Sequence, residues 1–289
     1  LFKNAPSGDD FDTVTDNGLS ESVFMKSVKQ VISSKFAGLM PKAMVGDAIQ
    51  MDSKQDYFTQ CLEDRYLFRM GVSEPFILSY RQHRMDGKIV GSNFSGNMGM
   101  KKASGEPATL FLNQVVMKTV CQYLTMASGP RFELYKGDDY LCFALNPQID
   151  EISMKDLYDV TTFRVSMKVY DDGAEWCGLT VSSKGIFPNL KRKLDKIMGA
   201  KWKTYTHFAE YQISLRNYVN FVNECGLKGT IENTALNSNI SLSDAEMCYQ
   251  AIESWSHVNE EQWVRATTLM KVRPMLPYLE GSFEKLQEK

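Results

Sequence analysis

The chain has 289 residues, of which 24% are charged and 43% are hydrophobic, and this composition is typical of a globular fold rather than a disordered one. The 33 Lys and Arg residues nearly balance the 35 Asp and Glu residues, and the formal net charge of −2 excludes a uniformly basic nucleic-acid coat but leaves room for a local basic groove. No transmembrane segment is predicted, because every long apolar stretch is interrupted by polar residues, and no signal peptide is recognisable. The six cysteines and three histidines share no ligand spacing, which argues against zinc and predicts reduced thiols.

The first hundred residues predict alternating helices and short strands. Residues 1–18 are polar and predict a loop, and apolar spacing predicts helices over about 20–38 and 52–70. A short strand between them, residues 43–45, leads into Gly46-Asp47. Residues 76–100 contain two strand-like pieces around Asp86-Gly87, a dipeptide that favours a hairpin turn.

The remaining residues predict a mixed body followed by an all-helical tail. A long helix is expected between about residues 101 and 126, with Pro107 in its first turn. Strands follow at 132–135, 140–145, 163–170 and 175–181, and helical spacing takes over after about residue 183. The predicted fold class is therefore α+β.

The first motif with chemical content is an acidic turn, Gly137-Asp138-Asp139, between two apolar strands. Turns favour Asp and Gly, so a solvated turn is the simplest interpretation of such a triplet. The same triplet at Gly8-Asp9-Asp10 has no flanking strands, and we assign that copy to a plain loop. Strands on both sides of Asp138 and Asp139 would instead hold their carboxylates in a fixed place.

A catalytic Mg²⁺ ion needs oxygen ligands from a second segment as well. Asp47 ends a strand-like run, a position from which a sheet can present a ligand, and Asp52 follows five residues later. Each of the two could instead be the N-cap of a following helix. Further along the chain, Thr109 and Asn113 are four residues apart and share one face of a predicted helix that begins near Ser104-Gly105. A polar stripe on an apolar helix either finds partners or binds a ligand.

Taken in order, these residues resemble the A, B and C motifs of viral RNA-dependent RNA polymerases, most closely those of the alphavirus-like supergroup, which includes tobamoviruses and negeviruses. The resemblance covers roughly residues 44–200 and rests on five stretches: Asp47-Ala-Ile-Gln-Met-Asp52-Ser-Lys-Gln, Leu67-Phe-Arg-Met-Gly71, Ser104-Gly105-Glu-Pro-Ala-Thr109-Leu-Phe-Leu-Asn113, Gly137-Asp138-Asp139 and Glu175-Trp-Cys177-Gly178. Lys168 falls on a predicted strand where the family has a motif with a lysine.

The resemblance implies a right-hand polymerase, with an antiparallel palm sheet and flanking helices followed by a helical thumb. We expect residues 1–43 to be a partial fingers segment, residues 44–183 the palm with a fingers insertion at about 72–100, and residues 184–289 the thumb. The basic fingers strands that grip the triphosphate are not recognisable before Asp47, so the fingers are expected to be incomplete, with Lys101 and Lys102 as an alternative grip.

The activity that the resemblance implies is RNA-templated RNA synthesis. Asp47, Asp138 and Asp139 would hold two Mg²⁺ (or Mn²⁺) ions, and Asp52 and Asn113 would test the ribose 2′-hydroxyl. Ser104, Gly105 and Thr109 would contact substrate or template. Lys168 would be a general acid for pyrophosphate, although a surface lysine on an edge strand is an equal alternative.

The implied partners are an RNA template and primer, NTPs, and other replicase domains such as a helicase and a methyltransferase. The implied location is the host cytoplasm, on membrane-associated replication complexes reached through other replicase parts. A basic run from Lys191 to Lys203 could line an RNA exit channel or could be a solvated helix face. Two other functions are left open: a reverse transcriptase or DNA polymerase on the same palm, and an inactive, host-captured fragment that acts as an interaction module.

Overall fold

The computed structural model describes residues 11–15, 21–102 and 108–272 of the chain. It divides into two compact units, Leu1–Ile186 and Phe187–Lys289. The helices of the first unit are α1 (Glu21–Phe36), α2 (Tyr57–Arg69), α3 (Glu74–Met85), α4 (Thr109–Leu124) and α5 (Glu151–Val160). Its strands are β1 (Phe11–Thr15), β2 (Lys42–Ala48), β3 (Lys88–Val90), β4 (Ser95–Asn97), β5 (Thr125–Met126), β6 (Arg131–Lys136), β7 (Asp139–Ala144), β8 (Gln148–Ile149), β9 (Val165–Tyr170), β10 (Gly173–Trp176) and β11 (Leu179–Ser182), while β12 (Gly185–Pro188) crosses into the second unit.

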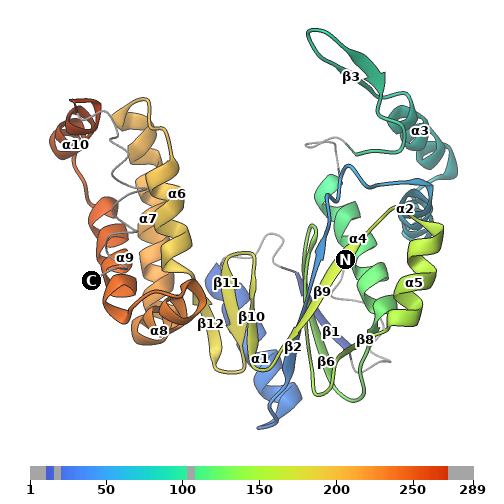
Figure 1. Ribbon diagram of the computed structural model, residues 1–289, viewed down its shortest axis with the longest axis horizontal. Coiled ribbons are helices and arrows are strands. Elements are labelled where there is room, and N and C mark those ends of the chain that lie inside the picture. Colours follow the sequence, from blue (N-terminus) through green and yellow to red (C-terminus); the bar gives the residue numbers. More distant parts are fainter. Residues whose placement is uncertain (1–10, 16–20, 103–107, 273–289) are drawn as a thin grey trace, which may run out of the picture. The chain divides into compact units, whose positions relative to one another are not determined.

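A five-stranded sheet with the order β1-β6-β7-β2-β9 organises the first unit (Figure 1). Its pairs are antiparallel except for β1 and β6, which run parallel. The register between the central strands β2 and β7 places Asp47 directly opposite Asp139. Because directly opposite residues project from the same face of a sheet, both carboxylates lie on one face.

Helix α4 packs against this sheet, contacting both β6 and β7. Successive residues of a strand point to opposite faces, so Gly46 projects away from the face that carries Asp47. A Cβ atom on Gly46 would lie 3.0 Å from the Tyr140 ring and 3.1 Å from Cys121 Sγ of α4. Glycine at position 46 therefore permits the close approach of sheet and helix. The core around this contact contains Met44, Met117, Val120, Cys121, Tyr135, Tyr140 and Phe163.

The second unit is a helical bundle. It comprises α6 (Leu190–Gly199), α7 (Tyr205–Cys225), α8 (Leu227–Ser238), α9 (Leu242–Ser256) and α10 (Glu260–Val272). Leu215 and Val222 of α7 pack with Ile252 of α9 in its buried core, and the partly buried Trp255 packs against the same cluster. None of the helices that the structure describes is long and apolar enough to span a membrane.

The structure corrects the sequence-based expectations for several elements. Residues 76–85 belong to helix α3, not to a strand, and the β3–β4 hairpin turns at Gly91–Phe94 instead of at Asp86-Gly87. Helix α2 begins at Tyr57 and is capped by Asp56, whose carboxylate accepts from the Thr59 amide, so Asp52 precedes the helix without capping it.

Three further segments differ from the predictions. Residues 11–15 form strand β1 where a loop was predicted. Residues 175–181 form a hairpin of β10 and β11, which turns at Cys177-Gly178 with positive φ at both residues, as a tight two-residue hairpin requires. Helix α4 begins at Thr109, and the predicted first-turn residue Pro107 lies outside the described residues.

Candidate active site

Two acidic residues face each other at the end of the central strand pair. Asp47 lies near the end of β2, and Asp139 opens β7. The N-cap alternative for Asp47 is wrong, because the residue lies within a strand and pairs across the sheet with both Asp139 and Ser166 of β9.

Asp138 joins this pair from the β6–β7 turn. Lys136 and Asp139 are paired across the two strands, which leaves Gly137 and Asp138 as a two-residue loop. Gly137 has a φ of +59°, a value that glycine adopts without strain in the first position of such a loop. Asp47, Asp138 and Asp139, hereafter the carboxylate cluster, are thus held by two strands and one tight turn.

The electrostatics of the carboxylate cluster show that its charges interact. Partial desolvation, and then the charge of Asp139, raise the pKa of Asp47 above its ordinary value of 3.8. Desolvation is also the main cause that raises the pKa of Asp138, and the charges of Asp139, Asp47 and Asp52 raise it further, against the lowering effect of its own backbone amide. The cluster is therefore a site of concentrated negative charge that a cation would relieve.

Asp52 and Asn113 form a hydrogen-bonded pair next to this cluster. Asp52 lies in the turn after β2 and is half-buried, while Asn113 lies in the second turn of α4 and is buried. The Asn113 side-chain amide donates from Nδ2 to Asp52 Oδ1 at 3.1 Å. Since the charge of Asp52 also acts on Asp138, the structure brings the residues of the three predicted motifs together.

The other predicted site residues have different environments. Thr109 is the first residue of α4 and lies one turn before Asn113 on the same helix face. Lys168 is exposed on the edge strand β9, opposite Val45 and two residues beyond the Ser166 that faces Asp47. Ser104 and Gly105 lie outside the described residues.

Sequence reasoning did not assign Cys177 a place in the site. The Cys177 thiol donates from Sγ to Asp139 Oδ2 at 3.0 Å, from the β10–β11 turn. The Cys-Gly motif was visible in the sequence, but its contact with the acidic turn depends on the packing of two hairpins.

Sequence reasoning also missed a buried ion-pair network formed by Glu63, Arg84 and Lys102. Glu63 of α2 accepts from Lys102 Nζ at 2.5 Å and from Arg84 NH1 at 2.7 Å, and each of the three side chains is at most 1% exposed. Lys102 Nζ also donates to Asn113 Oδ1 at 2.9 Å, which connects the network to the Asp52–Asn113 pair. The ammonium is therefore committed inside the fold, so Lys102 cannot be the alternative grip on a triphosphate.

The donor chemistry of the carboxylate cluster fits a hard divalent cation. Among the described residues, no group of three or more His, Cys, Asp and Glu side chains is placed to hold a metal ion on its own. Mg²⁺ rarely uses such a cage, since it is usually held by one or two carboxylates together with substrate phosphates and water. Neighbouring carboxylates such as Asp47, Asp138 and Asp139 supply that kind of partial site.

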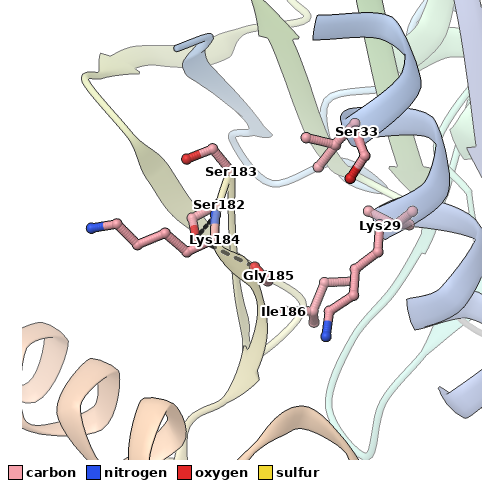
Figure 2. Close-up of a pocket in the computed structure, with 9 residues that line it drawn as sticks. Lys29, Ser33, Ser182, Ser183, Lys184, Gly185 and Ile186 are labelled. Atoms are coloured by element: carbon pink, nitrogen blue, oxygen red, sulfur yellow. Dashed lines mark hydrogen bonds between the residues drawn. The ribbon is translucent and has the colours of Figure 1, made fainter. Parts of the chain in front are cut away.

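Two of the hollows in the described part of the first unit lie away from the carboxylate cluster. One is an apolar groove of about 380 Å³ between α2, α4 and α5, lined by residues such as Phe58, Tyr123 and Val160. Figure 2 shows the other, in which Lys29 and Ser33 of α1 face the turn between β11 and β12. The Lys184 side chain extends away from that hollow, and its ammonium lies 3.4 Å from the Asp172 carboxylate. Neither hollow is lined by a predicted site residue.

Comparison with known proteins finds similarity in sequence to a viral replicase and similarity in fold to solved polymerase structures. No family model matches the chain. The chain is 28% identical over 283 residues to the replicase of Beet necrotic yellow vein virus (isolate Japan/S). This alignment covers 94% of the chain but 13% of the replicase, so the chain spans about an eighth of the length of that relative.

Among solved structures, the chain is similar to the RNA-dependent RNA polymerase of a human picorbirnavirus, with a TM-score of 0.52 at 13% identity over 81% of this chain and 54% of that one. An insertion-loop deletion mutant of the same polymerase gives a TM-score of 0.52 at 10% identity, over 79% and 53% of the two chains. This likeness confirms the predicted fold class, an α+β palm followed by a helical thumb. The chain is therefore similar in sequence to part of a viral replicase and similar in fold to viral RNA-dependent RNA polymerases.

Proposed function

We propose that the chain carries out RNA-templated RNA synthesis, by nucleotidyl transfer from NTPs, in the replication and transcription of a viral genome. The observation that carries this proposal is the placement of Asp47 directly opposite Asp139, with Asp138 in the adjoining turn. In the reaction, the primer 3′-oxygen bonds to the α-phosphorus of the NTP, the bond to the bridging oxygen breaks, and pyrophosphate leaves.

The carboxylate cluster would hold Mg²⁺ or Mn²⁺ for this reaction. Two such ions would supply positive charge at the attacking and leaving oxygens. Asp47 and Asp138 would be the main residues that hold the ions, and Asp139, oriented by the Cys177 thiol, would be a secondary ligand. Desolvation is the main cause of the raised pKa values of Asp47 and Asp138, but neighbouring carboxylates raise both further, and bound cations would offset that negative charge.

Asp52 and Asn113 would select the sugar of the incoming nucleotide. A carboxylate and an amide can together accept from and donate to a 2′-hydroxyl, and a deoxyribose would leave them with unmet hydrogen bonds. Their direct hydrogen bond supports a shared role. This pair also favours a ribonucleotide polymerase over a reverse transcriptase, which usually places a bulky aromatic residue at the sugar.

Further roles rest on the family resemblance. Lys168 would donate a proton to pyrophosphate, Thr109 would contact the substrate, and Ser104 and Gly105 would lie under the template and primer. Residues 44–183 would form the palm, with a fingers insertion at about 72–100, and residues 184–289 the thumb. Residues 1–43 would belong to the fingers.

RNA template, RNA primer and NTPs would be the direct partners, and helicase and methyltransferase domains would be neighbours in the replicase. Replication complexes on membranes of the host cytoplasm would be the place of action, reached through those other domains.

Primer extension tests the proposal. The chain, alone and within a longer replicase segment that contains it, is given a primed RNA template, NTPs and Mg²⁺ at low salt. Asp47→Asn and Asp138→Asn should each lower the rate by more than the roughly 10–100-fold that is typical of losing an outer-shell metal partner.

Asp9→Asn, in the second copy of the Gly-Asp-Asp triplet, is the matched control and should keep the parent rate. A parent that extends no primer in either form, or an Asp138→Asn variant as active as the parent, would refute the proposed function.

A further inference from the structure

The Asp52–Asn113 pair is supported from behind by the buried ion-pair network. Asn113 uses its two amide atoms in opposite directions: Oδ1 accepts from Lys102 Nζ at 2.9 Å, and Nδ2 donates to Asp52 Oδ1 at 3.1 Å. The Lys102 side chain is fully buried, so water does not compete for its contacts. Lys102 is thus an internal partner of Asn113.

The chemistry of the lysine determines which way the Asn113 amide faces. An ammonium group can only donate hydrogen bonds, so the atom of Asn113 that faces it must be the oxygen. The flipped amide would place an NH₂ group against the ammonium and the amide oxygen against the Asp52 carboxylate, losing both hydrogen bonds. Lys102 therefore selects the orientation in which Nδ2 faces Asp52.

Lys102 also contacts Asp52 directly. Its backbone amide donates to the Asp52 carbonyl oxygen at 3.1 Å. One residue thereby holds the turn after β2 through its main chain and the α4 helix through its side chain.

The position of Lys102 is in turn set by Glu63 and Arg84. Glu63 accepts from Lys102 with one carboxylate oxygen and from Arg84 with the other, while Arg84 NH2 donates to the Met100 carbonyl at 2.8 Å. Two cations, Lys102 and Arg84, balance the two anions Glu63 and Asp52. This balance allows a charged lysine to remain buried beside the site.

We propose that Lys102, held by Glu63 and Arg84, is a positioning residue for sugar selection. Lys102 fixes the Asn113 amide toward Asp52 and hence toward the 2′-hydroxyl of an incoming ribonucleotide. The inference rests on the proposed function and deepens it, because it assigns nucleotide selectivity to a residue that touches neither the nucleotide nor the metal ligands.

The test is the ratio of kcat/KM for ATP to that for dATP in primer extension. Lys102→Met keeps the aliphatic stem and removes the donor, and it should lower the ratio about tenfold, the scale of one lost hydrogen bond to a charged group. Lys102→Gln keeps an amide donor and should preserve most of the ratio. Lys155→Met is the matched control and should leave the ratio unchanged, since Lys155 is exposed on α5.

A double variant separates positioning from general loss of structure. If Lys102 acts through Asn113, Lys102→Met combined with Asn113→Ala should give the same ratio as Asn113→Ala alone. Should Lys102→Met fail to fold, the double variant Lys102→Met with Glu63→Gln removes the charges of Lys102 and Glu63 together. It should lower the ratio of kcat/KM values about tenfold as well.

Failure of this inference is distinct from failure of the proposed function. The positioning role alone is overturned if the parent extends primers and Asp138→Asn does not, but Lys102→Met leaves the ratio of kcat/KM values unchanged. It is also overturned if the losses of Lys102→Met and Asn113→Ala simply add in the double variant. A parent that extends no primer overturns the proposed function itself.

Discussion

The carboxylate cluster and the buried ion-pair network place charge in the same unit of the chain in opposite ways. Asp47 and Asp138 carry like charges at the solvent-exposed end of the sheet, and their pKa values are raised by partial desolvation and then by the charges of neighbouring carboxylates. Glu63, Arg84 and Lys102 are at most 1% exposed, and each charge has an opposite charge within hydrogen-bond distance.

The difference separates two roles. The buried network is complete within the protein, so it is suited to hold side chains in one arrangement. The carboxylate cluster is electrostatically incomplete, so its negative charge is available to a cation. Three predictions test this distinction, in order of decreasing effect.

Removal of one partner from the buried network should be far more harmful than neutralisation of a cluster carboxylate. Glu63→Ala leaves two buried cations without their anion and should lower the free energy of unfolding by about 3–5 kcal/mol. Asp47→Asn relieves repulsion and should leave that free energy unchanged or slightly higher. Urea unfolding of both variants is the measurement, and equal losses of stability would show that the two regions do not differ as described.

Loss of the Asn113 side chain should change selectivity more than it changes catalysis. Asn113→Ala removes the amide that links Asp52 to Lys102 and should weaken the preference for NTP over dNTP by about 1–3 kcal/mol, the cost of an unmet buried hydrogen bond. Single-nucleotide incorporation kinetics on an RNA template give this ratio. Thr119→Ala is a useful control, because Thr119 lies on the same helix and donates only to the Val115 carbonyl. An unchanged ratio for Asn113→Ala would remove the pair from sugar selection.

The smallest effect concerns pH and metal. Because the pKa values of Asp47 and Asp138 are raised in the folded chain, the folded state binds protons more readily than the unfolded state. The cost of these charges to stability is therefore absent below their ordinary pKa of 3.8, grows as the pH rises through the folded values, and is fully present above them.

Magnesium should offset that cost, so Mg²⁺ should raise the Tm of the parent at pH 7 and raise it less in Asp138→Asn. The gain in the free energy of unfolding from Mg²⁺ should be under about 1 kcal/mol, because solvent screens exposed charges. Thermal melts with and without Mg²⁺ measure it, with Asp9→Asn as the variant that should respond like the parent. The same metal response in the parent, Asp47→Asn and Asp138→Asn would place the ion elsewhere.

Local patterns in the sequence were sufficient to predict the acidic turn and the helices α2 and α4. Strands 132–135 and 140–145 flank Gly137-Asp138-Asp139 closely, so turn chemistry and the apolar runs on both sides predict a hairpin, and the structure has that hairpin. The motif order from Asp47 to Asp139 was likewise readable from the residues alone. The roles of these residues in catalysis stay predictions.

Where a local pattern suited both a helix and a strand, the sequence was not sufficient to predict the secondary structure. Phe76-Ile77-Leu78 is a short apolar run that suits a strand as well as a helix. In the structure it lies in α3, which begins after Ser73 with Pro75 in its first turn, and only Ile77 of the three is buried. Strand β1 was missed for a related reason, since a polar segment becomes a strand only when the edge of β6 offers it hydrogen bonds.

Only the tertiary structure decided which distant residues meet. Asp47 and Asp139 are brought opposite each other by strand register, and Lys102 meets Glu63, 39 positions away, because α2 packs against α4. A lysine two residues before a Ser-Gly motif looks in sequence like a surface cation near a phosphate. Its burial, its charge partners and its hydrogen bond to Asn113 follow from packing between segments far apart in the chain, and periodicity and spacing carry no information about such contacts.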